Sequence, residues 1–139
     1  MKCLIDTNIL VSACGYPDSV PAKALKKAAE FPCCALICSY SLSEMLNVVN
    51  KKFPHKINIM QEFLLLLCLE TEIIRTPAEK ESVCGETKIR DVKDRPIFRA
   101  AVAANADIII TGDRDFLESG LTNPRIMSSS DFVNLELEN

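Results

Sequence analysis

The feature that most constrains this chain is a series of short apolar runs, each of which ends abruptly in polar residues. The first run covers residues 3–5, has no helical spacing, and stops at Asp6, Thr7 and Asn8. Buried strands of parallel sheets have this pattern, because helices cover both faces and remove the alternation of polar and apolar residues. Ligands of open parallel sheets bind beyond the carboxyl ends of the strands. The run therefore predicts a central strand with Asp6 at the ligand-binding edge, although a helix cap at Asp6 or Thr7 fits it equally well.

Further runs of strand length alternate with segments of helical spacing along the rest of the chain. We predict strands at residues 3–5, 33–38, 71–76 and 107–111, and a weaker one at 124–127. The predicted helices cover residues 22–30, 42–52, 56–72, 96–104 and 131–135, with a short polar helix at 78–83 and a loop at 85–93. Because no linker or repeat interrupts this alternation, residues 1–139 are expected to form one α/β domain with a parallel sheet and right-handed crossovers.

The composition narrows the class of protein. Hydrophobic residues make up 48% and charged residues 25% of the chain, and the net charge of −3 gives no global basic field for a nucleic-acid partner. Seven cysteines follow no secretory signal, so we expect free thiols in a reducing cytoplasm, with Cys3, Cys38 and Cys68 buried in apolar runs. A zinc site is disfavoured, because His55 is the only histidine and no C-x-x-C pair occurs. No apolar run reaches the roughly 18 residues of a membrane span.

The predicted helix at residues 56–72 carries an unusually wide apolar stripe. Phe63, Leu65 and Leu66 extend it beyond the face that one sheet needs. We favour a deeply buried helix, and the alternative is a surface for self-association or for a partner. A homodimer is therefore a candidate assembly.

Five acidic residues follow or flank the predicted strands at what would be one edge of the sheet: Asp6, Glu44, Asp94, Asp113 and Asp115. Clustered carboxylates repel one another, and burial strengthens the effect, so such a cluster stays ionised only beside cations. Oxygen ligands suit Mg²⁺ or Mn²⁺. Two such ions about 3.5–4 Å apart form a site that cleaves phosphodiesters.

Each acid also has a purely structural interpretation. Asp6 fits a cap, Glu44 fits a capping box with Ser41, Asp94 fits the first turn of a helix, and Asp113 and Asp115 fit a turn. Five such coincidences at one edge are the weaker explanation. The remaining aspartates are read as caps, turns or surface, with Asp91 as a candidate support behind the site: Asp18, Asp91, Asp107 and Asp131.

The chain resembles the PIN domain, in the single-domain prokaryotic form found as the toxin of toxin–antitoxin pairs. The resemblance rests on LIDTN at residues 4–8, Ser43-Glu44, the helix that follows Asp94, and TGDRDF at residues 111–116. It implies a three-layer α/β/α sandwich around a parallel five-stranded sheet and an Mg²⁺- or Mn²⁺-dependent endoribonuclease. The implied catalytic and metal-binding acids are Asp6, Glu44, Asp94 and Asp113, with Asp115 as an accessory ligand and Asn8, Ser43 and Thr111 as polar supports. Family members often carry paired acids where this chain has Asp94-Arg95-Pro96.

The expected reaction is metal-assisted hydrolysis, in which the cations activate water and stabilise the charge that builds up on phosphorus. Single-stranded RNA is the expected substrate, with its backbone held by cations near the edge of the sheet. The leading candidates for these contacts are Lys93, Arg95 and Arg114, although each fits a solvated surface as well.

Two interpretations of another class remain open. One is a catalytically degenerate domain that binds RNA or protein without cleaving it. The other is a phosphoryl-transfer enzyme with Asp6 as nucleophile, which is disfavoured because Asn8 replaces a second acid and no glycine-rich phosphate loop occurs. A toxin role, with an antitoxin protein as partner, is a separate hypothesis that the resemblance suggests.

Overall fold

Five parallel strands form the centre of the molecule, in the order β3-β2-β1-β4-β5. The computed structural model describes residues 1–138. The strands are β1 (Lys2–Ile5), β2 (Cys34–Cys38), β3 (Glu72–Ile74), β4 (Ile108–Ile110) and β5 (Arg125–Met127). All four strand pairs are parallel, so the carboxyl ends of the strands meet at one edge, as the sequence predicts.

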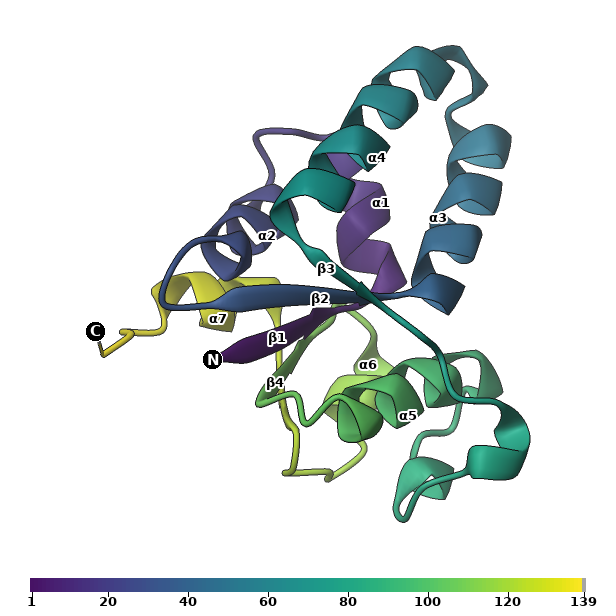
Figure 1. Ribbon diagram of the computed structural model, residues 1–139, viewed down its shortest axis with the longest axis vertical. Coiled ribbons are helices and arrows are strands. Elements are labelled where there is room, and N and C mark those ends of the chain that lie inside the picture. Colours follow the sequence, from purple (N-terminus) through teal and green to yellow (C-terminus); the bar gives the residue numbers. More distant parts are fainter. Residues whose placement is uncertain (139) are drawn as a thin grey trace.

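Helices cover both faces of this sheet (Figure 1). They are α1 (Thr7–Gly15), α2 (Val20–Ala29), α3 (Ser39–Lys52), α4 (Ile57–Glu70), α5 (Arg95–Ala103), α6 (Arg114–Leu117) and α7 (Ser129–Asn134). Helices α1 to α4 and α7 lie on one side of the sheet, and α5 and α6 lie on the other (Figure 1). The predicted three-layer α/β/α sandwich with a parallel five-stranded sheet is confirmed.

The two layers of core explain why the strands read as continuous apolar runs. Cys3 and Ile5 of β1 face the core beneath α1 and α2, whereas Leu4 faces the core that contains Phe98 of α5. All three β1 residues are fully buried. Burial on both faces removes the polar alternation from the sequence.

Most differences from the predicted elements lie between β3 and α5. The predicted strand at 71–76 is shortened to Glu72–Ile74, and the predicted helix at 78–83 is one turn of 3₁₀ helix, η2 (Glu79–Glu81). The predicted loop contains a second such turn, η3 (Glu86–Lys88), and a third, η4 (Val92–Asp94), runs directly into α5. Short polar segments of this kind carry weak periodicity, so their tertiary contacts decide their conformation.

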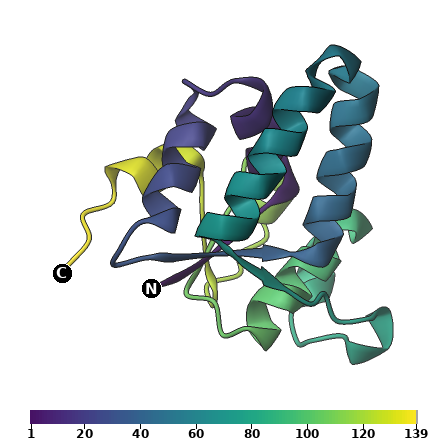
Figure 2. The same cartoon turned by 45° about the horizontal axis from the view of Figure 1, so that its top comes forward.

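The prediction that the helix at 56–72 is deeply buried is wrong. Only Met60 and Leu67 of α4 are buried, whereas Leu65, Leu66 and Leu69 are 63%, 53% and 74% exposed. Figures 1 and 2 show the reason, since α3 and α4 form an antiparallel pair that extends away from the sheet. The apolar stripe on α4 is therefore largely a surface.

The cysteine predictions hold only in part. Cys3 and Cys38 are buried as predicted, but Cys68 lies on the exposed side of α4. All seven cysteines are free thiols. Among residues 1–138, no helix combines the length and apolar character needed to cross a bilayer.

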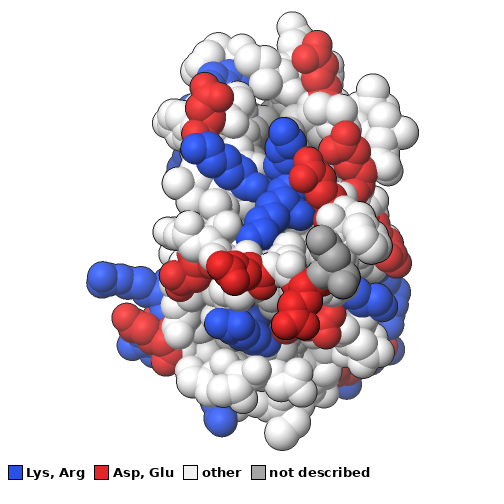
Figure 3. Space-filling model, turned by 90° about the vertical axis from the view of Figure 1, so that its left-hand side faces the viewer, with Lys and Arg blue, Asp and Glu red and all other residues white. Residues whose placement is uncertain are grey.

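On the face shown in Figure 3, acidic and basic side chains are interspersed. A nucleic-acid backbone would therefore meet charges of both signs on this face rather than a basic patch.

Candidate active site

Asp6 occupies the point where β1 ends and α1 begins. Its Oδ1 accepts a hydrogen bond from the Thr7 backbone N–H at 2.7 Å, and its Oδ2 accepts one from the Thr111 hydroxyl at 2.6 Å. Only 2% of the residue is exposed. Asp6 thus caps α1, as the structural interpretation expects, and is also a buried carboxylate at the edge of the sheet.

Asp113 is placed beside Asp6 by the neighbouring strand. Thr111, which follows β4, is fully buried, and its hydroxyl also accepts a hydrogen bond from the Asp113 N–H at 3.0 Å. Asp113 Oδ1 accepts one from the Asp115 N–H at 2.8 Å, which caps α6. The two central strands therefore bring two carboxylates to one place through a shared threonine.

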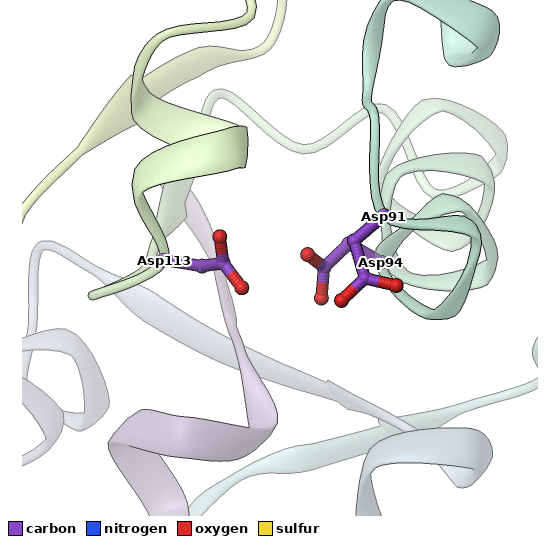
Figure 4. Close-up of side chains that lie close together, drawn as sticks. All are labelled: Asp91, Asp94 and Asp113. Atoms are coloured by element: carbon purple, nitrogen blue, oxygen red, sulfur yellow. The ribbon is translucent and has the colours of Figure 1, made fainter.

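Asp94 reaches the same place from the connection between β3 and α5. One oxygen each of Asp91, Asp94 and Asp113 lie within 4.8 Å of one another. Figure 4 shows Asp113 on one side of a gap, with Asp94 of η4 and Asp91, which caps η4, facing it. Asp94 is 8% exposed, and its buried Oδ2 has no hydrogen-bond partner among the described residues. The cluster therefore has the spacing and the free acceptor of a cation site.

Glu44 joins the group from α3. Its Oε1 accepts a hydrogen bond from the Thr7 hydroxyl at 2.8 Å. The capping-box interpretation of Glu44 is wrong, because α3 begins at Ser39 with Cys38 as its N-cap and no side-chain cap. Glu44 thus lies beyond the first turn, where its carboxylate is available to the site.

The electrostatics of the site follow from this crowding. Burial raises the pKa of Asp6 to about 6, although its hydrogen bonds to Thr111 and Thr7 oppose the shift. Burial, followed by the charges of Asp6 and Asp113, raises the pKa of Asp94 to about 8. Without a cation, the carboxyl groups of Asp6 and Asp94 therefore resist ionisation.

A cavity of about 340 Å³ opens over these residues. It lies between α1, α3 and η4, and its wall includes the predicted residues Asn8 and Lys93. The residues that line it are Asp6, Thr7, Asn8, Val11, Ser12, Glu44, Val48, Lys52, Asp91, Lys93, Asp94 and Asp113. Four of the predicted acids thus share one cavity.

The remaining predicted residues lie outside this cavity. Asp115 forms an ion pair with Arg90 at 2.8 Å, and the Arg95 Nε donates a hydrogen bond to the Ile89 carbonyl at 3.0 Å. Arg114 is exposed on α6, and Ser43 is exposed on α3. The structure therefore brings together Asp6, Asn8, Glu44, Lys93, Thr111, Asp94 and Asp113.

Three residues of the site have a larger role than the sequence predicts. The sequence predicts Asp91 only as a support and Thr7 only as a cap, but Asp91 reaches the cluster itself and Thr7 binds Glu44. Lys52 is not among the predicted residues, although it is eight residues after Glu44 on one helix. The four-residue spacing of Glu44, Val48 and Lys52 is a signal that could have identified this lysine.

Comparison with known proteins identifies the domain. The family model described as PIN domain matches residues 2–115. Proteins with PIN domains are generally nucleases that use divalent metals. No curated protein matches the chain.

Solved structures share the fold at low sequence identity. VapBC2 from Rickettsia felis, bound to a promoter DNA fragment, matches with a TM-score of 0.68 and 22% identity, covering 92% of this chain and 98% of that one. DNA-bound VapBC from Salmonella typhimurium matches with a TM-score of 0.64 and 15% identity, covering 93% of this chain and 98% of that one. PAE2754 from Pyrobaculum aerophilum matches with a TM-score of 0.63 and 15% identity, covering 96% of this chain and 87% of that one. Together with the family match and the acids at the carboxyl edge, these results show that the chain belongs to the PIN-domain family.

Proposed function

We propose that this protein is a divalent-metal-dependent endoribonuclease. The observation that carries the proposal is the buried Asp94 carboxylate, whose Oδ2 has no partner among the described residues and which faces Asp113 and Asp91. A buried charge without a partner is costly. A cation shared with the neighbouring carboxylates removes that cost.

The donor set suits a hard cation. The cluster offers carboxylate oxygens alone, which Mg²⁺ and Mn²⁺ prefer to nitrogen or sulfur ligands. We assign the cation to Asp6, Glu44, Asp94 and Asp113, with Asp91 beside them and Asp115 as an accessory ligand that would first have to leave Arg90. When bound, such an ion supplies Lewis-acid chemistry for phosphodiester hydrolysis.

The surrounding residues orient these acids. Thr111 holds Asp6 and Asp113 together, and Thr7 holds Asp6 and Glu44 together. Lys93 lines the same cavity and is exposed, so its ammonium can contact the phosphate backbone of RNA. Arg95 and Arg114 remain candidates for contacts with the RNA farther from the cleaved bond. A metal-dependent nuclease requires acids held in place by hydrogen bonds and a basic side chain beside them at one cavity.

The test is RNA cleavage with and without Mg²⁺ or Mn²⁺. Asp6→Asn and Asp94→Asn are each expected to reduce cleavage by about a hundredfold or more, because each removes several kcal/mol of transition-state stabilisation. Asp18→Asn, at an exposed turn position that does not line the cavity, is the matched control. Full cleavage by folded Asp94→Asn protein would refute the assignment.

The melting temperature with and without divalent metal separates a binding module from a nuclease. A catalytically degenerate domain would bind RNA without cleaving it, and divalent metal would not raise its melting temperature. The nuclease is expected to show a metal-dependent rise in melting temperature that Asp94→Asn removes.

We further propose that the protein is the toxin of a toxin–antitoxin pair. The similar Rickettsia and Salmonella structures are VapBC assemblies, and this chain has an apolar groove of about 320 Å³ between α1, α2 and α4 that could receive a partner. Growth arrest on expression, relieved by the product of a neighbouring gene, is the expected result. Harmless expression of an RNase-active protein would contradict it.

We also propose a homodimer, supported by the exposed Leu65 and Leu69 on α4. Light scattering tests this assembly directly, and a monomeric mass at high concentration would exclude it.

A further inference from the structure

The cavity that contains the acids continues as a groove between two helices. Helix α1 contributes Asn8, Val11 and Ser12 to its wall, and α3 contributes Glu44, Val48 and Lys52. Residues three or four positions apart lie on one face of a helix, so each set forms a row. Because α1 packs against α3, the two rows line one groove.

The two ends of this groove differ in charge. Glu44 is near the start of α3, beside the carboxylates, whereas Lys52 is the last residue of that helix. Eight residues of α-helix separate their Cα atoms by about 12 Å along the axis. Lys52 therefore contacts a part of the ligand that lies beyond the acids, and not the group that the acids themselves contact.

Lys52 is available to a ligand. It is exposed, and none of the ion pairs among residues 1–138 involves it. Its neighbour Lys51 is also exposed but does not line the groove. The pair thus offers two adjacent lysines of similar exposure, only one of which faces the site.

The middle of the groove is apolar. Val11 and Val48 are half-buried and lie between the acids and Lys52. An apolar patch between a cation-binding site and an ammonium matches a nucleotide, whose base and ribose contact apolar surface and whose phosphate pairs with lysine.

We propose that the groove between α1 and α3 is a substrate subsite that binds the nucleotide adjacent to the cleaved bond of single-stranded RNA. Val11 and Val48 contact its base or ribose, and the Lys52 ammonium binds its phosphate. This inference rests on the proposed nuclease function and extends it, because it makes recognition depend on the length of strand beyond the cleaved bond.

Binding without cleavage tests the subsite. In an Asp94→Asn background, affinity for a fluorescein-labelled single-stranded oligouridylate is measured by anisotropy over a series of salt concentrations. Loss of one phosphate contact is expected to reduce the slope of log K against log salt by about 0.7 for a single strand. Lys52→Ala is expected to show this change, Lys51→Ala is not, and Lys52→Arg is expected to keep most of the slope. Equal losses in the two alanine variants, or none in Lys52→Ala, would overturn the proposal.

Cleavage kinetics give a second readout. With Asp94 intact, Lys52→Ala is expected to raise KM for the oligouridylate by about five- to tenfold with little change in kcat, as for the loss of one phosphate contact. The increase should be smaller for the dinucleotide UpU, whose only phosphate is the one at the cleaved bond, so that it has no second phosphate for Lys52 to bind. The same increase for both substrates would refute the subsite. If the unmodified protein cleaves no RNA with Mg²⁺ or Mn²⁺, the proposed function fails, whereas the binding series still decides the role of Lys52.

Discussion

Two buried carboxylates, Glu86 and Asp94, lie eight residues apart on the connection between β3 and α5, and their surroundings are opposite. Glu86 accepts hydrogen bonds from the Arg99 guanidinium at 3.0 and 3.1 Å and from the Val83 N–H at 2.9 Å. The pairing with Arg99 lowers the pKa of Glu86. Asp94 has an oxygen without a partner among the described residues, and its pKa is raised to about 8.

The difference lies in the basic side chains that the fold places beside each carboxylate. The fold supplies Glu86 with an internal cation, and the bidentate pair fixes the connection against α5. At the sheet edge, Arg95 turns to the Ile89 carbonyl and Arg90 pairs with Asp115, so neither neutralises the cluster. The divalent cation that we propose for this site would supply the missing positive charge.

The largest expected effect is on the free energy of unfolding, which two similar substitutions of a carboxylate by an amide should change in opposite directions. Glu86→Gln leaves the Arg99 guanidinium buried without its counter-charge and is expected to lower the free energy of unfolding by about 3–5 kcal/mol. Asp94→Asn removes an unpaired charge and is expected to raise it by about 1–3 kcal/mol in metal-free protein at pH 8. Urea denaturation in EDTA measures both.

The control for this comparison is the exposed pair Arg75–Glu81. Its side chains are 71% and 40% exposed, so Glu81→Gln should change the free energy of unfolding far less than Glu86→Gln does. If Asp94→Asn destabilises the metal-free protein as strongly as Glu86→Gln does, the contrast between the two sites is wrong.

The next expected effect is a pH dependence of the metal-free protein. The unfolded chain releases the Asp6 and Asp94 protons near pH 3.8, whereas the folded protein retains them to about pH 6 and about pH 8. Between these limits the folded state binds more protons, so stability falls as the pH rises. The raised pKa of Asp6 alone corresponds to a loss of about 3 kcal/mol in the free energy of unfolding as the pH rises through this range.

Thermal unfolding in EDTA between pH 5 and pH 8 tests this expectation. The melting temperature should fall across that range, and saturating Mg²⁺ should reduce or reverse the fall, because the cation stabilises the ionised carboxylates. A melting temperature that rises steadily with pH in EDTA would show that these acids are already neutralised within the protein.

The smallest expected effect concerns the hydrogen bond between Thr7 and Glu44. Thr7→Val keeps the shape of the side chain but removes the hydroxyl, and is expected to cost about 1 kcal/mol of stability and about tenfold in Mn²⁺ affinity. Isothermal titration with Mn²⁺ measures the affinity. Thr7→Ser retains the donor and should stay near the parent value, so an equal loss in both variants would assign the effect to packing.

Much of the fold could be predicted because its signals are local. Strands such as β1 and β4 are buried on both faces and therefore appear as unbroken apolar runs. Asp6 and Asp113 follow those strands directly, so a parallel sheet places them at one edge. The connection between β3 and α5 was less predictable, because its single turns depend on distant contacts such as the pair of Glu86 with Arg99.

Local sequence patterns are enough to predict the strands, the parallel edge and the acids that follow it, since apolar runs and strand ends are properties of neighbouring residues. Packing between distant elements brings Asp91 to the cluster and pairs Asp115 with Arg90. It also places Lys52, but not Arg95 or Arg114, along the groove. The tertiary structure also decides that α4 exposes its leucines. The physical reason is that a side chain's partners are set by which elements pack together, and spacing along one element does not contain that information.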